Sequence, residues 1–466
     1  MIDADKVRES GFDLERRRAQ GTRALVVGPY LTERAAQRAV GSTPLRGPEA
    51  RLEEAAGLAG AIDLDVIGRV AVPLTEIRPA TYLGKGKVDE IAAQVKDEAI
   101  DLVMVDGALS PVQQRNLEKA FGAKVIDRTG LILEIFGRRA RTREGALQVE
   151  LAHLAYQRSR LVRSWTHLER QRGGFGFLGG PGETQIESDR RLLQERMTRI
   201  ERDLEGVKKT RGLHRKSRRD VPFPVVALVG YTNAGKSTLF NRLTRAEVLA
   251  KDMLFATLDP TLRVVRLPHG AKIMLSDTVG FISDLPTMLV SAFRATLEEV
   301  IEADVILHVR DISHEDTQAQ SADVEQVLAD LGIEAHDPRL IEVWNKIDLV
   351  DADHRGGIEA SAEARPPEAR PLVVSAVTGE GLDVLLAAVE ERLAIGRSRI
   401  ALQLAPEDGQ GLAWLHENTE VLDRRADAQG TMHFVVRVPE EKVDRVLRRF
   451  PRAHVMGYVG VGKAAQ

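Results

Sequence analysis

The chain has 466 residues, a formal net charge of −3 and no cysteine. This length exceeds that of a usual single domain and predicts three or four domains. The small net charge gives no overall sign of a nucleic-acid partner, and the absence of cysteine excludes disulfides, thiolate zinc sites and a cysteine nucleophile. The residues from Met1 to Lys6 form no apolar signal region and no stretch is long enough to span a membrane, so a cytoplasmic protein is expected.

Residues 1–139 alternate short apolar runs, at 24–27, 102–105 and 125–126, with helical patterns such as 48–58 and 88–95. This alternation predicts a small α/β domain. Within it, Gly84-Lys85-Gly86-Lys87 is a weak phosphate-binding signal. A turn at the start of the following helix is the favoured interpretation, and a nucleotide site is the alternative.

Residues 140–220 contain two stripes of apolar side chains with heptad-like spacing. Their members are Leu147, Leu151, Leu154, Leu161, Trp165 and Leu168, and then Leu193, Met197, Ile200, Leu204 and Val207. A short glycine-rich segment, 173–182, separates the stripes. The pattern predicts an antiparallel helical hairpin with this segment at its tip.

The hairpin is rich in positive charge, carried by Arg138, Arg139, Arg141, Arg143, Arg158, Arg160, Arg163, Arg170 and Arg172, and at its base by Lys208, Lys209, Arg211, Arg215, Lys216, Arg218 and Arg219. A solvated helix face explains any one of these charges. Together with Phe175 and Phe177 at the tip, they predict a probe of structured RNA, because arginine binds phosphate and aromatic rings stack on unpaired bases. Contact with a partner protein is the alternative.

A glycine loop between an apolar run, 225–229, and a helical pattern, 238–243, carries the strongest signal. It reads Gly230-Tyr231-Thr232-Asn233-Ala234-Gly235-Lys236-Ser237, followed by Thr238. In this strand–loop–helix context, G-x-x-x-x-G-K-S binds phosphate through inward-turned N–H groups and a helix N-terminus. Lys236 is expected at the β- and γ-phosphates, and the Ser237 hydroxyl at Mg²⁺.

Two later motifs specify the nucleotide as GTP. Asp277-Thr278-Val279-Gly280 ends an apolar run; Asp277 is expected to reach Mg²⁺ through water, and the Gly280 N–H to contact the γ-phosphate. In Asn345-Lys346-Ile347-Asp348, the Asp348 carboxylate can accept from guanine N1 and N2, a donor pair that adenine lacks. Ser375-Ala376, followed by Val377, is expected to complete the guanine wall through the Ala376 N–H.

The position after Gly280, where Ras-like enzymes hold a water-orienting glutamine, is Phe281. Because a phenyl ring cannot orient water by hydrogen bonding, slow intrinsic hydrolysis is expected, with a partner supplying the missing positioning. Asn233 in the P-loop suggests K⁺ as a further cofactor, because a cation near the leaving phosphate would offset the negative charge that develops there.

Residues 221–395 are thus predicted to form a P-loop GTPase domain. In residues 396–466, strand-like runs at 400–404 and 433–438 and a helical pattern at 440–450 predict a small α+β domain.

The chain resembles the HflX family of ribosome-associated GTPases, in the Obg-HflX superfamily, over nearly all its length. The resemblance rests on three segments outside the nucleotide motifs, 81–87, 109–117 and 180–185, and on Phe255-Ala256-Thr257-Leu258-Asp259-Pro260, which matches the family's switch I. It implies a Ras-like P-loop GTPase domain preceded by a small α/β domain with an antiparallel helical hairpin and followed by a small α+β domain. Thr257 would then be the second Mg²⁺ ligand.

The resemblance also implies a function: binding of the large ribosomal subunit and its rRNA, and GTP-dependent splitting or rescue of stalled ribosomes under stress. Lys236, Thr257 and Gly280 would be the catalytic residues. A cytoplasmic monomer is expected, with peripheral membrane association in part. The alternatives are an RNA-remodelling protein whose N-terminal domain hydrolyses ATP, a tRNA-modifying GTPase, and an interaction scaffold.

Overall fold

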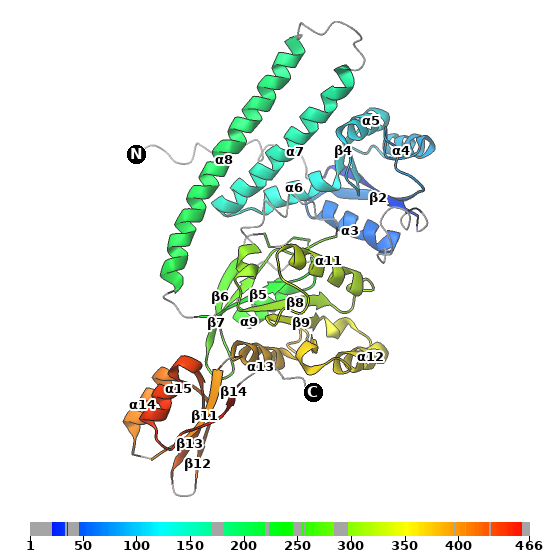
Figure 1. Ribbon diagram of the computed structural model, residues 1–466. Helices are drawn as coiled ribbons and strands as arrows, with labels where there is room; N and C mark the ends of the chain where they lie inside the picture. The colour runs from blue at the N-terminus through cyan, green and yellow to red at the C-terminus, as the bar shows by residue number, and fades with distance from the viewer. Residues whose placement is uncertain are drawn as a thin grey trace.

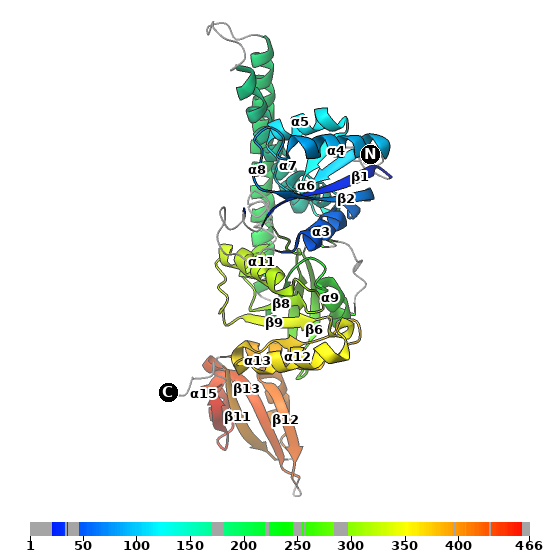
Figure 2. The same ribbon diagram turned by 90° about the vertical axis from the view of Figure 1, so that its right-hand side faces the viewer.

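A computed structural model describes residues 21–32, 35, 46–169, 181–219, 223–245, 254, 255, 257, 258, 260–283, 297–395, 397–405, 407–427 and 430–458, without the side chains of 162–169, 181–186 and 208–219. Three β-sheets and a long pair of helices follow one another along the molecule (Figure 1). Viewed from the side, the first domain and the hairpin lie at one end, the six-stranded sheet in the middle and the last sheet at the other end (Figure 2). In the described part of the chain, no helix combines the length and apolarity that a membrane span requires.

The first sheet has the order β2-β1-β3-β4 and is parallel throughout. Its strands are β1 (Arg23–Leu31), β2 (Asp65–Leu74), β3 (Leu102–Val105) and β4 (Lys124–Asp127). Helices α4 (Lys85–Asp97) and α5 (Pro111–Phe121) cover one face, and α3 (Pro48–Gly60) and α6 (Arg128–Arg139) the other. Gly84 is the N-cap of α4, so the turn predicted there is confirmed, and Lys87 pairs with Glu90 at 2.7 Å.

Helices α7 (Arg143–Glu169) and α8 (Pro181–Arg219) form the predicted antiparallel hairpin (Figure 1). Their shared core contains Leu154, Met197, Ile200 and Leu204, with Leu147, Leu151 and Leu193 packed against it. The stripe members from Leu147 to Leu154 and from Leu193 to Leu204 therefore pack against each other within one chain. The glycine-rich tip, with Phe175 and Phe177, lies outside the described residues.

The central sheet has the order β10-β9-β8-β5-β7-β6, and only β6 runs antiparallel to its neighbour among the described strands. Its strands are β5 (Val225–Val229), β6 (Thr261–Arg266), β7 (Lys272–Asp277), β8 (Val305–Asp311), β9 (Leu340–Asn345) and β10 (Leu372–Val373). One face packs on α9 (Lys236–Thr244) and α13 (Leu382–Leu393), and the other on α11 (Thr317–Asp330). Further helices are α12 (Ala352–Glu363), η1 (Ile347–Leu349) and η2 (Pro367–Ala369). The loops that follow β5, β7, β9 and β10 carry the predicted nucleotide motifs, at the edge where ligands bind in such sheets.

The last sheet is antiparallel with the order β12-β13-β11-β14. It consists of β11 (Arg397–Leu404), β12 (Glu420–Ala426), β13 (Met432–Pro439) and β14 (His454–Tyr458), and it packs on α14 (Gly409–Asn418) and α15 (Glu440–Arg449). The predicted fold class, a Ras-like P-loop domain between an α/β domain with a helical hairpin and an α+β domain, is confirmed.

Candidate nucleotide-binding site

The glycine motif after β5, residues 230–237, forms a loop up to Gly235 and the start of α9, and its backbone requires glycine at two positions. Gly230 has φ 149°, and a Cβ there would lie 2.1 Å from the Val309 carbonyl oxygen. Gly235 has φ 90°, and a Cβ would lie 2.2 Å from Asn345 Nδ2. Both glycines let the loop close tightly against neighbouring strands. This loop has the geometry of a phosphate-binding P-loop, and α9 begins directly behind it at Lys236.

Lys236 is buried beneath the P-loop. Its Nζ donates to the carbonyl oxygens of Gly230 and Tyr231 at 3.0 and 2.7 Å. Burial lowers the pKa of Lys236 from 10.5 to about 8, against the opposing attraction of Asp277. Folding therefore places a desolvated cation where the P-loop encloses phosphate, and an anion bound there would favour its charged form.

Three oxygen-bearing side chains meet beside Lys236. Asp277 Oδ2 accepts from Ser237 Oγ at 2.7 Å and from Thr257 Oγ1 at 2.8 Å, and the two hydroxyl oxygens lie 3.0 Å apart. Burial raises the pKa of Asp277, while the Ser237 hydrogen bond acts in the opposite direction. The other carboxylate oxygen, Oδ1, is buried without a hydrogen-bond partner in the described structure. A set of hard oxygens with one unsatisfied carboxylate oxygen fits Mg²⁺.

The segment 277–283, which we call switch II, is joined to the P-loop by backbone hydrogen bonds. Thr232 N donates to Phe281 O at 2.7 Å, and Phe281 N donates to Gly230 O at 3.1 Å. A Cβ on Gly280 would lie 2.8 Å from Thr232 Cγ2, so glycine is required here too. The Phe281 ring is 1% exposed and packs in the core between sheet and helices, so it points away from solvent and cannot orient a water molecule.

Asn345 connects the P-loop to the loop after β10. Its Nδ2 donates to Ala234 O at 2.9 Å, and its Oδ1 accepts from Ala376 N at 3.0 Å. The Ala376 N–H, expected to face guanine, is thus engaged by Asn345 and holds the loop in place. Lys346 pairs with Asp311 at 2.8 Å, while Asp348 is exposed beside it.

The remaining predicted residues lie around the same edge of the sheet. Thr278 Oγ1 donates to Leu228 O at 2.5 Å, and Ser375 Oγ accepts from Thr378 N at 3.0 Å. Phe255, Leu258 and Val279 are buried, and Val377 is exposed. Asn233 has a left-handed backbone with φ 60°, and Thr238 lies in the first turn of α9. Ala256 and Asp259 lie outside the described residues.

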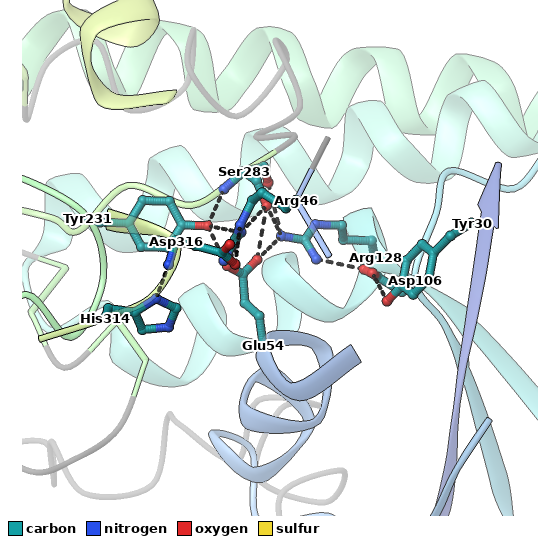
Figure 3. Close-up of polar contacts among 9 residues, drawn as sticks. All are labelled: Tyr30, Arg46, Glu54, Asp106, Arg128, Tyr231, Ser283, His314 and Asp316. Atoms are coloured by element: carbon teal, nitrogen blue, oxygen red, sulfur yellow. Dashed lines mark hydrogen bonds and ion pairs between the residues drawn. The ribbon is translucent and has the colours of Figure 1, made fainter. Parts of the chain in front are cut away.

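Sequence reasoning missed a polar cluster behind the P-loop, made by Arg46, Glu54, Arg128, Tyr231 and Ser283 (Figure 3). These residues come from both the first domain and the GTPase domain. Apart from Tyr231, which belongs to the glycine motif, they carry no motif, and each charged residue taken alone predicts a solvated surface position. Only the spacing of Tyr231 and Ser283 relative to the glycine motifs could have drawn attention to them.

Models of four protein families match successive parts of the chain. They are described as GTP-binding GTPase N-terminal (49–137), GTP-binding GTPase middle region (139–218), 50S ribosome-binding GTPase (225–346) and HflX C-terminal domain (362–456). Among solved structures, a GTP-binding protein from Sulfolobus solfataricus in complex with GDP is similar at 22% identity and a TM-score of 0.41, over 80% of this chain and 99% of that one.

Curated relatives match at higher identity. GTPase HflX of Escherichia coli is 46% identical over 80% of this chain and 86% of its own. GTPase HflX of Magnetococcus marinus is 52% identical over 83% of this chain and 88% of its own. The chain therefore belongs to the HflX family and is a GTP-binding GTPase.

Proposed function

We propose that this GTPase binds the large ribosomal subunit in its GTP form and acts as a GTP-dependent factor that splits or rescues stalled ribosomes under stress. The observation that carries the proposal is the helical hairpin, which packs on α5 and α6 of the first domain and whose far end extends beyond all three sheets (Figures 1 and 2). Helix α8 has 39 residues, which corresponds to about 58 Å at 1.5 Å per residue. A rod of this length reaches well into a large ribonucleoprotein.

The charge distribution limits where the hairpin would contact rRNA. Over residues 187–207 of α8, six carboxylates balance five arginines, whereas residues 208–219 hold seven basic residues and no acidic one. Arg138 lies 3.1 Å from Asp63, and Arg160 pairs with Asp127 at 2.7 Å. These two arginines, expected on an RNA-binding face, are thus engaged by the first domain. The proposed rRNA contacts are therefore the tip and the basic base of the hairpin.

We assign the nucleotide roles from the geometry of the site. Lys236 would hold the β- and γ-phosphates with the P-loop N–H groups, the Gly280 N–H would contact the γ-phosphate, and Asp348 would select guanine. Ser237 and Thr257 would hold Mg²⁺, with Asp277 acting through a water molecule. Bound Mg²⁺ would offset negative charge on the phosphates during transfer to water. The γ-phosphate would order both switches, and hydrolysis would release them.

Hydrolysis in this scheme depends on the partner. Phe281 cannot orient water, so intrinsic turnover is slow, and the ribosome accelerates it by ordering the switches. Asn233 supports K⁺ as an additional activator near the leaving phosphate. Equal hydrolysis rates in KCl and NaCl would exclude K⁺.

The decisive experiment compares GTP hydrolysis with and without purified large ribosomal subunits. Small subunits are the matched control, and Lys236→Ala measures the hydrolysis that does not come from this site. Strong stimulation by large subunits alone, weakened by salt, supports the proposal. Stimulation by neither subunit, together with no co-sedimentation, contradicts it.

We further propose domain boundaries at 139/140, 220/221 and 395/396, which the separate sheets and the hairpin support. Limited proteolysis at these positions tests them. A monomer in the cytoplasm fits the internal pairing of the hairpin stripes, and light scattering would measure its mass.

A further inference from the structure

Buried charges join the first domain to the GTPase domain (Figure 3). The Glu54 carboxylate on α3 lies between two guanidinium groups, with Arg46 Nη1 at 2.7 Å from Oε2 and Arg128 Nη2 at 2.5 Å from Oε1. All three side chains are 7% exposed. Removing one partner would leave uncompensated charge in the interior, so the cluster is stable only while its members remain together.

This cluster forms hydrogen bonds with switch II at Ser283. The Ser283 N–H donates to the Tyr231 hydroxyl at 2.8 Å, and the Ser283 carbonyl oxygen accepts from Arg128 Nη2 at 2.9 Å. Ser283 Oγ donates to Glu54 Oε1 at 3.1 Å. Arg46 Nη1 also donates to Ser283 Oγ at 3.1 Å, so three residues of the first domain hold the third residue after Gly280, in a segment that already pairs with the P-loop.

Arg128 is itself fixed within the first domain. Its Nη1 donates to Asp106 Oδ1 at 2.6 Å, and Asp106 Oδ2 accepts from Tyr30 at 2.8 Å. Arg46 extends the cluster to the N-cap of α11, with Nε 3.4 Å from Asp316 Oδ2. The contacts with Ser283 are therefore supported from both domains, and displacement of Ser283 would break its hydrogen bonds with Arg46, Glu54, Arg128 and Tyr231.

The first domain also contacts switch I. The Phe255 ring packs edge-on against Phe136 of α6, with centroids 4.7 Å apart and an interplanar angle of 79°. A Cβ on Gly57 of α3 would lie 3.2 Å from Leu254 Cδ1. In the same structure, Thr257 lies in hydrogen-bond contact with Ser237 and Asp277. Switch I is thus closed over the candidate metal ligands, the arrangement that γ-phosphate and Mg²⁺ stabilise.

We propose that Glu54 and Arg128 are positioning residues that couple docking of the first domain to the nucleotide state. The docked first domain holds switches I and II in the arrangement that binds GTP, so docking raises the affinity for GTP relative to GDP. By linkage, GTP favours docking to the same extent, and hydrolysis weakens it. The inference rests on GTP binding at the P-loop and is independent of the ribosomal partner.

The first test measures the dissociation constants of GDP and a non-hydrolysable GTP analogue by calorimetry for the wild type and Glu54→Gln. The substitution keeps the shape and removes the charge. We expect the ratio of the two dissociation constants, GDP over GTP analogue, to fall by at least about 5-fold, which is the low end of allosteric coupling. The dissociation constant of GDP itself should change little. Glu53→Gln, an exposed neighbour on α3, is the matched control and should behave as the wild type.

A second measurement follows the position of the first domain directly. Because the chain has no cysteine, Asp97→Cys on α4 and Ser361→Cys on α12, both exposed positions, give a specifically labelled pair for energy transfer. The wild type should show one narrow distance distribution with the GTP analogue and a broader one with GDP. Glu54→Gln should broaden the distribution with the GTP analogue as well.

The outcomes separate this inference from the nucleotide site itself. An unchanged affinity ratio in Glu54→Gln, or identical distance distributions with both nucleotides in the wild type, overturns the coupling. If Glu54→Gln does not fold, Ser283→Ala removes the hydroxyl contacts with Glu54, Arg46 and Arg128 and keeps the backbone contacts of Ser283. A smaller loss of GTP preference is then expected, and no loss overturns the proposal. Failure of the wild type to bind either nucleotide would instead refute the assigned site.

Discussion

The Tyr231 hydroxyl accepts a hydrogen bond from the backbone N–H of Ser283 at 2.8 Å and thereby ties the P-loop to switch II. The same hydroxyl donates to Glu54 of the first domain. Burial and the neighbouring Glu54 raise the pKa of Tyr231, so the hydroxyl remains protonated and keeps its donor role. One phenol therefore joins the nucleotide loop, a switch and a second domain.

Lys236→Ala should abolish most of the GTPase activity. Lys236 is the buried cation at the P-loop, and its removal takes away preorganised positive charge where the phosphates develop negative charge. We expect kcat to fall by at least about 10²-fold, the usual effect of losing one such donor. Single-turnover hydrolysis measures this loss. A variant that retains wild-type kcat would show that Lys236 does not contact the transferred phosphate.

Thr257→Ala should weaken binding of the GTP analogue and leave binding of GDP unchanged. The Thr257 hydroxyl belongs to the oxygen set with Ser237 and Asp277, where switch I places it in this structure. Loss of a hydrogen bond or ligand contact to a charged group predicts about 10-fold weaker binding of the analogue in Mg²⁺. Thr257→Ser keeps the hydroxyl and is the control. With EDTA present, wild type and Thr257→Ala should bind the analogue equally; a difference that persists without Mg²⁺ would argue against a metal-ligand role.

Phe281→Ala should destabilise the GTPase domain. The ring is 1% exposed in the core, so its truncation leaves a cavity and should lower the free energy of unfolding by about 3–5 kcal/mol. Urea denaturation followed by circular dichroism measures the change. Val377→Ala, at a side chain 65% exposed, should change stability by less than about 0.5 kcal/mol. Equal stabilities of the two variants would place the Phe281 ring outside the core.

Acid should weaken the contribution of Glu54 to stability. Burial alone would raise the pKa of Glu54, but Arg128 and Arg46 outweigh it and lower the pKa from 4.5 to about 2. A carboxylate with a depressed pKa stabilises the fold above its unfolded pKa, and this contribution is lost as pH falls towards the folded value. The stability difference between wild type and Glu54→Gln should therefore be constant above pH about 5 and shrink between pH 4.5 and about 2. A difference independent of pH would show that Glu54 is not held as a buried ion.

The loop of the candidate nucleotide site could be predicted because the residues that indicate it are close together in the sequence. Gly230, Gly235 and Lys236 lie within one eight-residue motif, and the strands before the motifs are short segments rich in apolar residues. The hairpin was predictable for a similar reason, since heptad-like spacing specifies a partner of the same kind. Both signals depend on neighbours in sequence.

The junction between domains was not predictable, because its contacts join residues far apart in the chain. Glu54 meets Tyr231 across 177 positions, and Arg128 meets Ser283 across 155. Charged residues taken singly predict solvent exposure. Arg160 shows the same limit: taken alone, its place on a basic helix predicts a solvated side chain, whereas it pairs with the buried Asp127.

Helix α8 ends at Arg219, only a few residues before β5, the strand that leads into the P-loop. The hairpin is therefore joined to the amino end of the strand whose carboxyl end carries the P-loop. With a length of about 58 Å, a rigid helix that turns by about 5° at its base moves its far end by about 5 Å. A small rotation where α8 joins β5 would therefore displace the far end of the hairpin by about the pitch of one helical turn.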